Sequence, residues 1–172
     1  MLAYRVVADS DQLPGVTELT ETRVHLEIPV QGSNFPAAGE AASKVKKTLQ
    51  KLGIDSTLTR RVSIATYEAE MNIVIHADYG KITLQVDAGG IWVRAEDRGK
   101  GIPDIDQAMS EGFSTAPERV REMGFGAGMG LPNIKKCADQ LEINTKLNFG
   151  TTVNMGFSYP TAKRENGQPK PN

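Results

Sequence analysis

The stretch EMGFGAGMGLPNIKK, residues 122–136, decides the fold, because it places glycines at 124, 126, 128 and 130 directly before a segment with helical spacing. Glycine loses more conformational freedom on folding than any other residue, so a run of four needs a reason. A helix start offers unpaired N–H groups and the positive end of the helix dipole, and glycines let further N–H groups approach a polyphosphate. The alternative is a flexible hinge followed by an ordinary helix start. The stretch carries neither a P-loop nor a dinucleotide-binding signature.

Upstream of this loop, YEAEMNIVIHA (67–77) places Glu68 and Asn72 on one face of a predicted helix. That face otherwise continues an apolar stripe, on which a carboxylate and a carboxamide are costly to bury without hydrogen bonds or a cation. Asn72 could offer its oxygen to Mg²⁺, and Glu68 could orient or deprotonate a nucleophile. A hydrogen bond between the helix and a neighbouring loop is the other interpretation of such a pair.

Between these two motifs, IWVRAEDRGKGIP (91–103) ends a predicted strand on a carboxylate. Asp97 continues the inward-facing row of that strand, where an isolated charge needs a hydrogen-bond donor. Gly99 and Gly101 allow the backbone to turn sharply and to approach a flat ligand. A carboxylate in this place is suited to accept the exocyclic amine of adenine, and an ordinary Asp-Gly turn is the alternative.

The remaining periodicities predict a two-layer α+β sandwich, in which one antiparallel or mixed sheet carries its helices on one face. His25 is expected to point away from the core. The expected strands are 23–30, 81–86, 91–97, 141–147 and 151–157. The expected helices run from Pro36 to Gly53, from Asp55 towards Gly80 and from Leu131 through Leu141, with a short helix within 101–112 and a loop at 112–123.

The length, composition and charge of the chain limit the classes of protein to which it can belong. The 172 residues suit one domain, expected over 1–159, and the polar segment 160–172 is expected to be a flexible tail. A net charge of −1 argues against binding to nucleic acid or to an anionic membrane through overall positive charge. The sequence shows neither a signal peptide nor an apolar run of membrane-spanning length, so we expect a cytoplasmic protein. The single cysteine excludes an internal disulfide and a cysteine-based metal cluster.

The motifs E-x-x-x-N, D-x-G-x-G, G-x-G-x-G and Gly150-Thr151 occur in an order that resembles the GHKL (HATPase_c-like) ATPase superfamily. Residues 33–158 look most like the anti-sigma regulatory factors of the serine/threonine-protein kinase type. The resemblance implies that Asn72 holds Mg²⁺, that Glu68 acts as general base and that Asp97 binds the adenine amino group. It implies a wider ATP-binding set that also contains Gly99, Gly101, Ile102, Gly126, Gly128, Gly130, Leu131 and Thr151.

The resemblance implies two possible functions. One is a kinase that uses Mg-ATP to phosphorylate a serine or threonine of an antagonist protein. The other is a switch without turnover, in which ATP orders a lid at 112–125 and the protein sequesters a sigma factor or another regulator. The presence of Glu68 favours the kinase, because a pure switch needs no base. Both functions imply a protein partner, and the resembled proteins suggest a homodimer. Arg119 and Arg121 either reach the phosphates or remain solvated.

Overall fold

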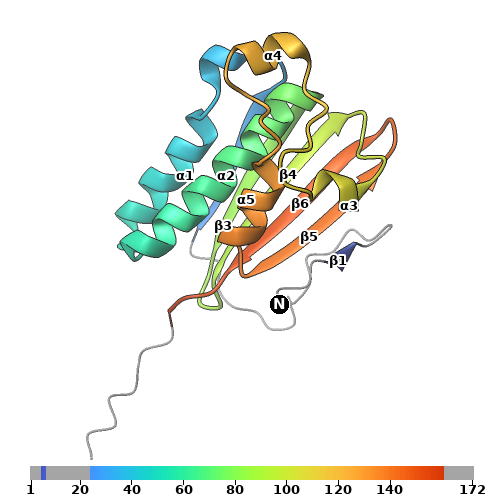
Figure 1. The fold of residues 1–172 in the computed structure, drawn as a ribbon. Helices are drawn as coiled ribbons and strands as arrows, with labels where there is room; N and C mark the ends of the chain where they lie inside the picture. The colour runs from blue at the N-terminus through green and yellow to red at the C-terminus, as the bar shows by residue number, and fades with distance from the viewer. Residues whose placement is uncertain (1–4, 7–23, 161–172) are drawn as a thin grey trace, which may run out of the picture.

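The protein is built around one mixed β-sheet (Figure 1). The computed structural model describes residues 5–6 and 24–160, and within them the sheet has six strands in the order β1-β5-β6-β4-β3-β2. β1 pairs in parallel with β5, whereas the other pairings are antiparallel. The predicted mixed, mostly antiparallel sheet is therefore confirmed. The strands are β1 Arg5–Val6, β2 Val24–Gln31, β3 Ala77–Val86, β4 Ile91–Gly99, β5 Gln140–Lys146 and β6 Gly150–Phe157.

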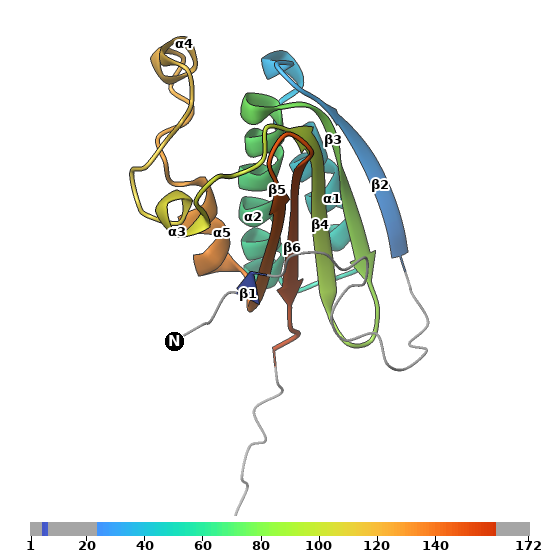
Figure 2. The same cartoon turned by 90° about the vertical axis from the view of Figure 1, so that its right-hand side faces the viewer.

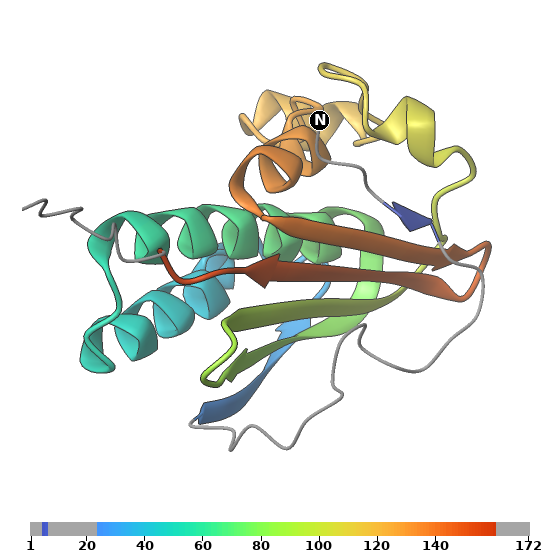
Figure 3. The same cartoon turned by 90° about the horizontal axis from the view of Figure 1, so that it is seen from below.

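Three helices cover one face of the sheet, as Figures 2 and 3 show. They are α1 Glu40–Lys51, α2 Ser56–His76 and α5 Gly130–Cys137. Their buried side chains, such as Leu49, Val62 and Ile134, form one hydrophobic cluster with the inward rows of the strands. The shorter helices α3 Ile105–Ala108 and α4 Glu118–Glu122 lie on the connection between β4 and α5. The expected two-layer arrangement is thus correct.

Element boundaries differ from the prediction in four places. The strand expected from residue 81 already begins at Ala77, because α2 ends at His76 and the chain passes directly into β3. The first helix begins at Glu40, because the chain forms only a 3-10 turn, η1 Phe35–Ala37, before Gly39 adopts a φ of 94°. The apolar spacing that continued the helix from Leu131 through Leu141 is misleading, since α5 ends at Cys137 and Leu141 lies in β5. Part of the expected loop at 112–123 is helical, forming α4.

A buried carboxylate holds the start of α1. Glu70, on α2, is only 2% exposed, and its two oxygens accept the backbone N–H groups of Gly39, Ala41 and Ala42 at 2.9–3.0 Å. The N-cap position of α1 is itself a glycine without a side chain to cap the helix. Glu70 therefore supplies from a neighbouring helix the acceptor that an N-cap residue usually provides.

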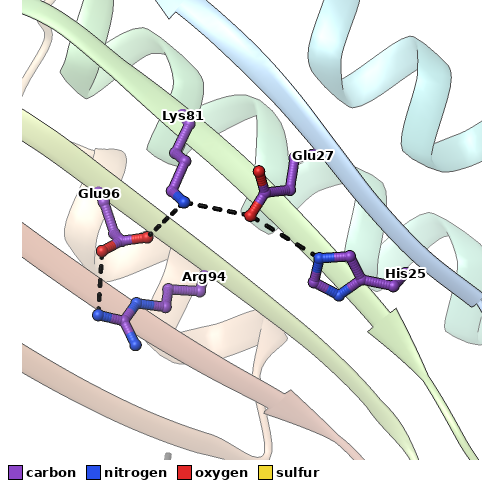
Figure 4. A network of polar contacts seen from close by, with 5 residues as sticks. All are labelled: His25, Glu27, Lys81, Arg94 and Glu96. Atoms are coloured by element: carbon purple, nitrogen blue, oxygen red, sulfur yellow. Dashed lines mark hydrogen bonds and ion pairs between the residues drawn. The ribbon is translucent and has the colours of Figure 1, made fainter. Parts of the chain in front are cut away.

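The sheet face opposite the helices is polar (Figure 4). Lys81 of β3 lies 3.1 Å from Glu27 of β2 and 3.6 Å from Glu96 of β4, and Glu96 also accepts a hydrogen bond from Arg94 at 3.0 Å. The hydrogen bond from Lys81 lowers the pKa of Glu27. His25 lies on the same face and is exposed, as its position in the alternating strand predicts. Such exposed ion pairs contribute little stability.

The expected domain over 1–159 and the expected tail over 160–172 both lie partly outside the described residues. Of the segment before residue 23, the structure describes only Arg5–Val6, and residues 161–172 of the expected tail lie outside the described range. Among the described residues, no helix has the length and apolarity that crossing a membrane would require.

Candidate functional site

The second half of α2 carries the predicted acid–amide pair. Glu68 and Asn72 follow one another along one helix face, as the spacing predicts, and both side chains are half-buried. A Cβ added at Gly130, the first residue of α5, would lie 3.1 Å from Asn72 Oδ1 and 3.6 Å from Glu68 Oε2. Glycine at this position therefore lets the backbone that enters α5 approach both polar side chains.

The predicted strand-end carboxylate lies where β4 meets β6. The backbone N–H of Thr151 donates to Asp97 Oδ1 at 3.2 Å. A Cβ at Gly150, whose φ is 127°, would collide with the backbone carbonyl of Asp97. Burial raises the pKa of Asp97, and hydrogen bonds from the N–H groups of Thr151 and Gly99 act in the opposite direction. Asp97 is thus a partly desolvated acceptor held by the sheet.

The turn after β4 is fastened to the β5–β6 hairpin. The N–H of Ile102 donates to Thr145 Oγ1 at 2.8 Å, and that hydroxyl lies 3.1 Å from Thr151 Oγ1. Gly101 has a φ of 72°, and a Cβ there would lie 2.5 Å from the carbonyl oxygen of Lys146. The predicted residues Gly101, Ile102 and Thr151 therefore form one connected group, and Thr145, a residue outside the predicted set, links Ile102 to Thr151.

The glycines of the loop before α5 have different neighbours. Gly126 and Gly128 have φ values of 70° and 74°, and both pack against the chain at 112–116. The N–H of Gly112 donates to the carbonyl of Gly128 at 3.0 Å. Only Gly130 faces the acid–amide pair. The loop and the segment that leads into α4 thus form one folded-back unit, residues 112–129, which includes the stretch 112–125 that we expect to act as a lid.

An aromatic contact joins this unit to the start of the first helix. Phe125 stacks on Phe35 of η1, with ring centroids 5.6 Å apart and an interplanar angle of 28°. Val120 of α4 is buried, whereas Arg119 and Arg121 are exposed on the same short helix. The structure therefore keeps both lid arginines in contact with solvent.

The three motifs meet along the last two turns of α2. Asn72 lies next to Gly130, and the carbonyl oxygen of His76 lies next to Gly99, 2.8 Å from where its Cβ would sit. Asn72 and His76 are four residues apart, so they are neighbours on the helix surface, about 6 Å from one another. Glycine loop, helix and strand end are consequently contiguous, as the order of the motifs led us to expect.

The arrangement suits an anion and an oxygen-liganded cation. The residue before α5, Met129, makes no side-chain cap hydrogen bond. Pro132 has no N–H and the N–H of Asn133 donates to Met129, so the N–H groups of Gly130 and Leu131 are the ones at this helix start that an anion could use. Within residues 5–6 and 24–160, no group of three or more His, Cys, Asp or Glu side chains could hold a metal ion. A Mg²⁺ ion beside Asn72 would therefore need phosphate and water oxygens as well, which is how Mg²⁺ is commonly bound with nucleotides.

One side chain of the site is absent from the sequence-based set. Asn133, in the first turn of α5, donates from Nδ2 to Glu68 Oε1 at 2.7 Å. The predicted Leu131 lies two residues earlier and is buried in the core, with a packing role. The available signal for Asn133 was a polar residue one turn after the last glycine of the loop, but spacing alone could not name its partner on α2.

Comparison with known proteins supports the same family. The model of the histidine kinase-like ATPase domain matches residues 33–157. The serine/threonine-protein kinase RsbT of Bacillus subtilis is 33% identical over 112 residues, which cover 63% of this chain and 78% of that protein. The anti-sigma F factor of Geobacillus stearothermophilus is 27% identical over 144 residues, which cover 79% of this chain and 92% of that protein.

A solved structure shows the same fold. The crystal structure of the RsbU and RsbW domains of a Mycobacterium tuberculosis protein superposes with a TM-score of 0.56 at 15% identity, covering 79% of this chain. The match spans only 32% of that longer chain. Because the domain model covers most of the sequence and the motifs are contiguous in space, the chain belongs to the histidine kinase-like ATPase domain family.

Proposed function

We propose that this protein binds Mg-ATP and transfers the γ-phosphoryl group to a serine or threonine hydroxyl of a partner protein. The observation that carries the proposal is the position of Gly130: Glu68 Oε2 and Asn72 Oδ1 both lie beside it, at the point where the glycine loop becomes α5. A candidate base, a candidate metal ligand and a phosphate-binding helix start are thereby adjacent. Phosphoryl transfer needs little more than positioning and charge neutralisation.

The geometry supports the roles that the family resemblance implies. The first N–H groups of α5 and of the glycine loop would bind phosphate oxygens, and Asp97 would accept the adenine amino group. Mg²⁺, held by Asn72 and the phosphates, would neutralise the charge that develops on the transferred group. Glu68 would take the proton from the partner hydroxyl. The hydroxyl oxygen would then bond to the γ-phosphorus while the bond between the γ-phosphorus and the ADP oxygen breaks.

The names of the relatives support a regulatory protein partner. One relative is named a serine/threonine-protein kinase and another an anti-sigma F factor. For this chain, the partner is accordingly proposed to be an antagonist protein with a phosphoacceptor residue or a sigma factor, bound by a homodimer. Sedimentation of the purified chain tests the homodimer, which would be wrong if only monomer is found at all concentrations.

Calorimetric titration with ATP, with and without Mg²⁺, tests the site. Wild-type protein should bind Mg-ATP, and Asn72→Ala should lose the Mg²⁺-dependent part of the affinity. Asn34→Ala is the matched control, because Asn34 is exposed and its side chain makes no cap hydrogen bond. Equal Mg-ATP affinity in wild type and Asn72→Ala would refute the metal assignment.

A second experiment separates the kinase from a switch without turnover. Proteins retained by the tagged chain with ATP or with ADP are incubated with γ-labelled ATP. Transfer of label to a serine or threonine, lost in Glu68→Gln but kept in the exposed Glu40→Gln control, supports the kinase. Complex formation that depends on ATP, without label on the partner, supports the switch instead.

A further inference from the structure

Asn133 makes a directed contact with the candidate base. Its Nδ2 donates to Glu68 Oε1 at 2.7 Å, although the two residues are 65 positions apart in the sequence. A carboxylate can only accept hydrogen bonds, so the contact requires the amide nitrogen, and not the amide oxygen, to face Glu68. Bonds of this length between an N–H and a charged oxygen are at the strong end of the range.

The contact leaves the two oxygens of Glu68 in different environments. Oε1 is engaged by Asn133, whereas Oε2 faces Gly130 and lies on the same side as Asn72 Oδ1. A glutamate side chain otherwise rotates about several bonds, and fixing it costs conformational entropy. Asn133 therefore selects which oxygen is presented to the end of the glycine loop.

Asn133 is also joined through its backbone to the end of the glycine loop. Asn133 lies in the first turn of α5 together with Gly130, and its backbone N–H donates to the carbonyl of Met129 at 2.9 Å. The donor of Glu68 therefore lies within one helical turn of the last glycine of the loop. The orientation of the base is thus tied to the position of the phosphate-binding backbone.

We propose that Asn133 is a positioning residue for the transfer step: it holds Glu68 so that Oε2 can take the proton. This inference rests on the proposed function. It adds a residue that does not touch the nucleotide or the partner and acts through Glu68.

The fold does not depend on this one contact. α5 is also fastened to α2 by the guanidinium of Arg61, whose Nε donates to the carbonyl of Cys137 at 2.9 Å. Leu131 and Ile134 of α5 are both buried in the core. A variant such as Asn133→Leu, similar in size but without the donor, should therefore remain folded.

The first test measures the bond without nucleotide. In ¹H–¹⁵N spectra of the full chain, the side-chain NH₂ signals of Asn133 are identified by their absence in Asn133→Leu. They should exchange slowly with solvent and should change position in Glu68→Gln. Fast exchange and unchanged signals in Glu68→Gln would mean that the bond does not persist in solution, and the inference would be wrong.

The second test uses ADP formation from Mg-ATP, with water in place of the partner hydroxyl. Asn133→Leu should lower the rate constant about 10- to 100-fold, the usual effect of misplacing a reacting group, while the Kd for Mg-ATP changes less than about 2-fold. Asn133→Gln, which keeps an amide donor, should recover part of the rate. In a Glu68→Gln background, Asn133→Leu should have no further effect.

The outcomes distinguish this inference from the proposed function. An unchanged rate in Asn133→Leu, or the same fractional loss with and without Glu68, would overturn the positioning role while leaving the transferase intact. A weaker Kd with an unchanged rate would assign Asn133 to binding alone and would also overturn it. A wild type that binds Mg-ATP but transfers label to none of the retained proteins would count against the transferase itself.

Discussion

The two ends of the site are held in different ways. At the strand end, Asp97 is fixed by a sheet in which its neighbours on β3, β4 and β6 have paired backbones. At the loop end, the backbone hydrogen bond between Gly112 and Gly128 closes the unit formed by residues 112–129 on itself. The stack of Phe125 on Phe35 joins this unit to η1, and a few of its own side chains are buried. The strand end is therefore a rigid reference, and the loop end is the part that can move at low cost.

The largest effect is expected from Gly150→Ala at the strand end. A Cβ there would collide with the carbonyl of Asp97, and the φ of 127° is unfavourable for alanine. Because the paired strands cannot separate locally, we expect a loss of about 3 kcal/mol or more in the free energy of unfolding, measured with urea. Gly53→Ala is the control, since its φ is 70° but nothing lies within 4 Å. Similar losses in both variants would contradict the rigid strand end.

Asp97→Asn comes next. Replacing the charged acceptor should weaken Mg-ATP binding by about 1.5–3 kcal/mol, or roughly 10- to 100-fold, in calorimetric titration. The exposed Asp78→Asn serves as control and should bind like the wild type. Normal ATP affinity in Asp97→Asn would remove Asp97 from the proposed adenine contact.

The stability difference between the wild type and Asp97→Asn should depend on pH, and its sign follows from the burial of Asp97. Since the pKa of Asp97 is raised in the folded protein, the folded state holds this proton more tightly than the unfolded chain. As the pH rises from about 3.9, the ordinary pKa of aspartate, through the raised value, the wild type should lose stability relative to Asp97→Asn. Above the raised pKa the difference should be constant. Urea unfolding curves of both proteins across this range provide the check.

Gly128→Ala tests the loop end with the same kind of change as Gly150→Ala. A Cβ would lie 2.5 Å from the backbone of Gly112 and Phe113, but here the unit can open. We expect a local cost of about 1–2 kcal/mol, seen as roughly 5- to 30-fold faster proteolysis within 112–129, with little change in global unfolding. Gly124 has a φ of 87° and nothing lies within 4 Å of an added Cβ, so Gly124→Ala should accelerate proteolysis less. If Gly128→Ala lowered the free energy of unfolding as much as Gly150→Ala does, the loop end would be as rigid as the strand end.

The smallest effect is expected from Phe125→Ala. Loss of the ring-on-ring contact with Phe35 should make the 112–129 unit easier to open by about 0.5–1.5 kcal/mol. Hydrogen exchange of the backbone amides at 112–126 would report it. Phe149→Ala is the control, because Phe149 is exposed and contacts a lysine rather than another ring. Unaltered exchange in Phe125→Ala would show that the stack does not hold the lid.

The sequence predicted what depends on periodicity. The place of Asp97 followed from alternation along one strand, and the pairing of Glu68 with Asn72 followed from helical spacing. The family resemblance supplied the roles of these residues, which remain proposals. Local periodicity is sufficient here because both motifs lie inside long, regular elements.

The sequence did not predict contacts between distant segments. Asn133 with Glu68, Phe125 with Phe35, and Glu70 with the start of α1 each join residues that only packing brings together. The start of α1 was misplaced for the same reason, since Gly39 adopts its positive φ where Glu70 accepts its N–H. Spacing along one element carries no information about which other element will lie opposite.

Glu68 and Glu70 leave α2 in nearly opposite directions, because successive residues are rotated by about 100° around a helix. One points towards the glycine loop, and the other is bonded to the backbone at the start of α1. α2 could not turn about its axis without pulling on α1. A fluorophore on the solvent side of α1 would consequently register such a turn.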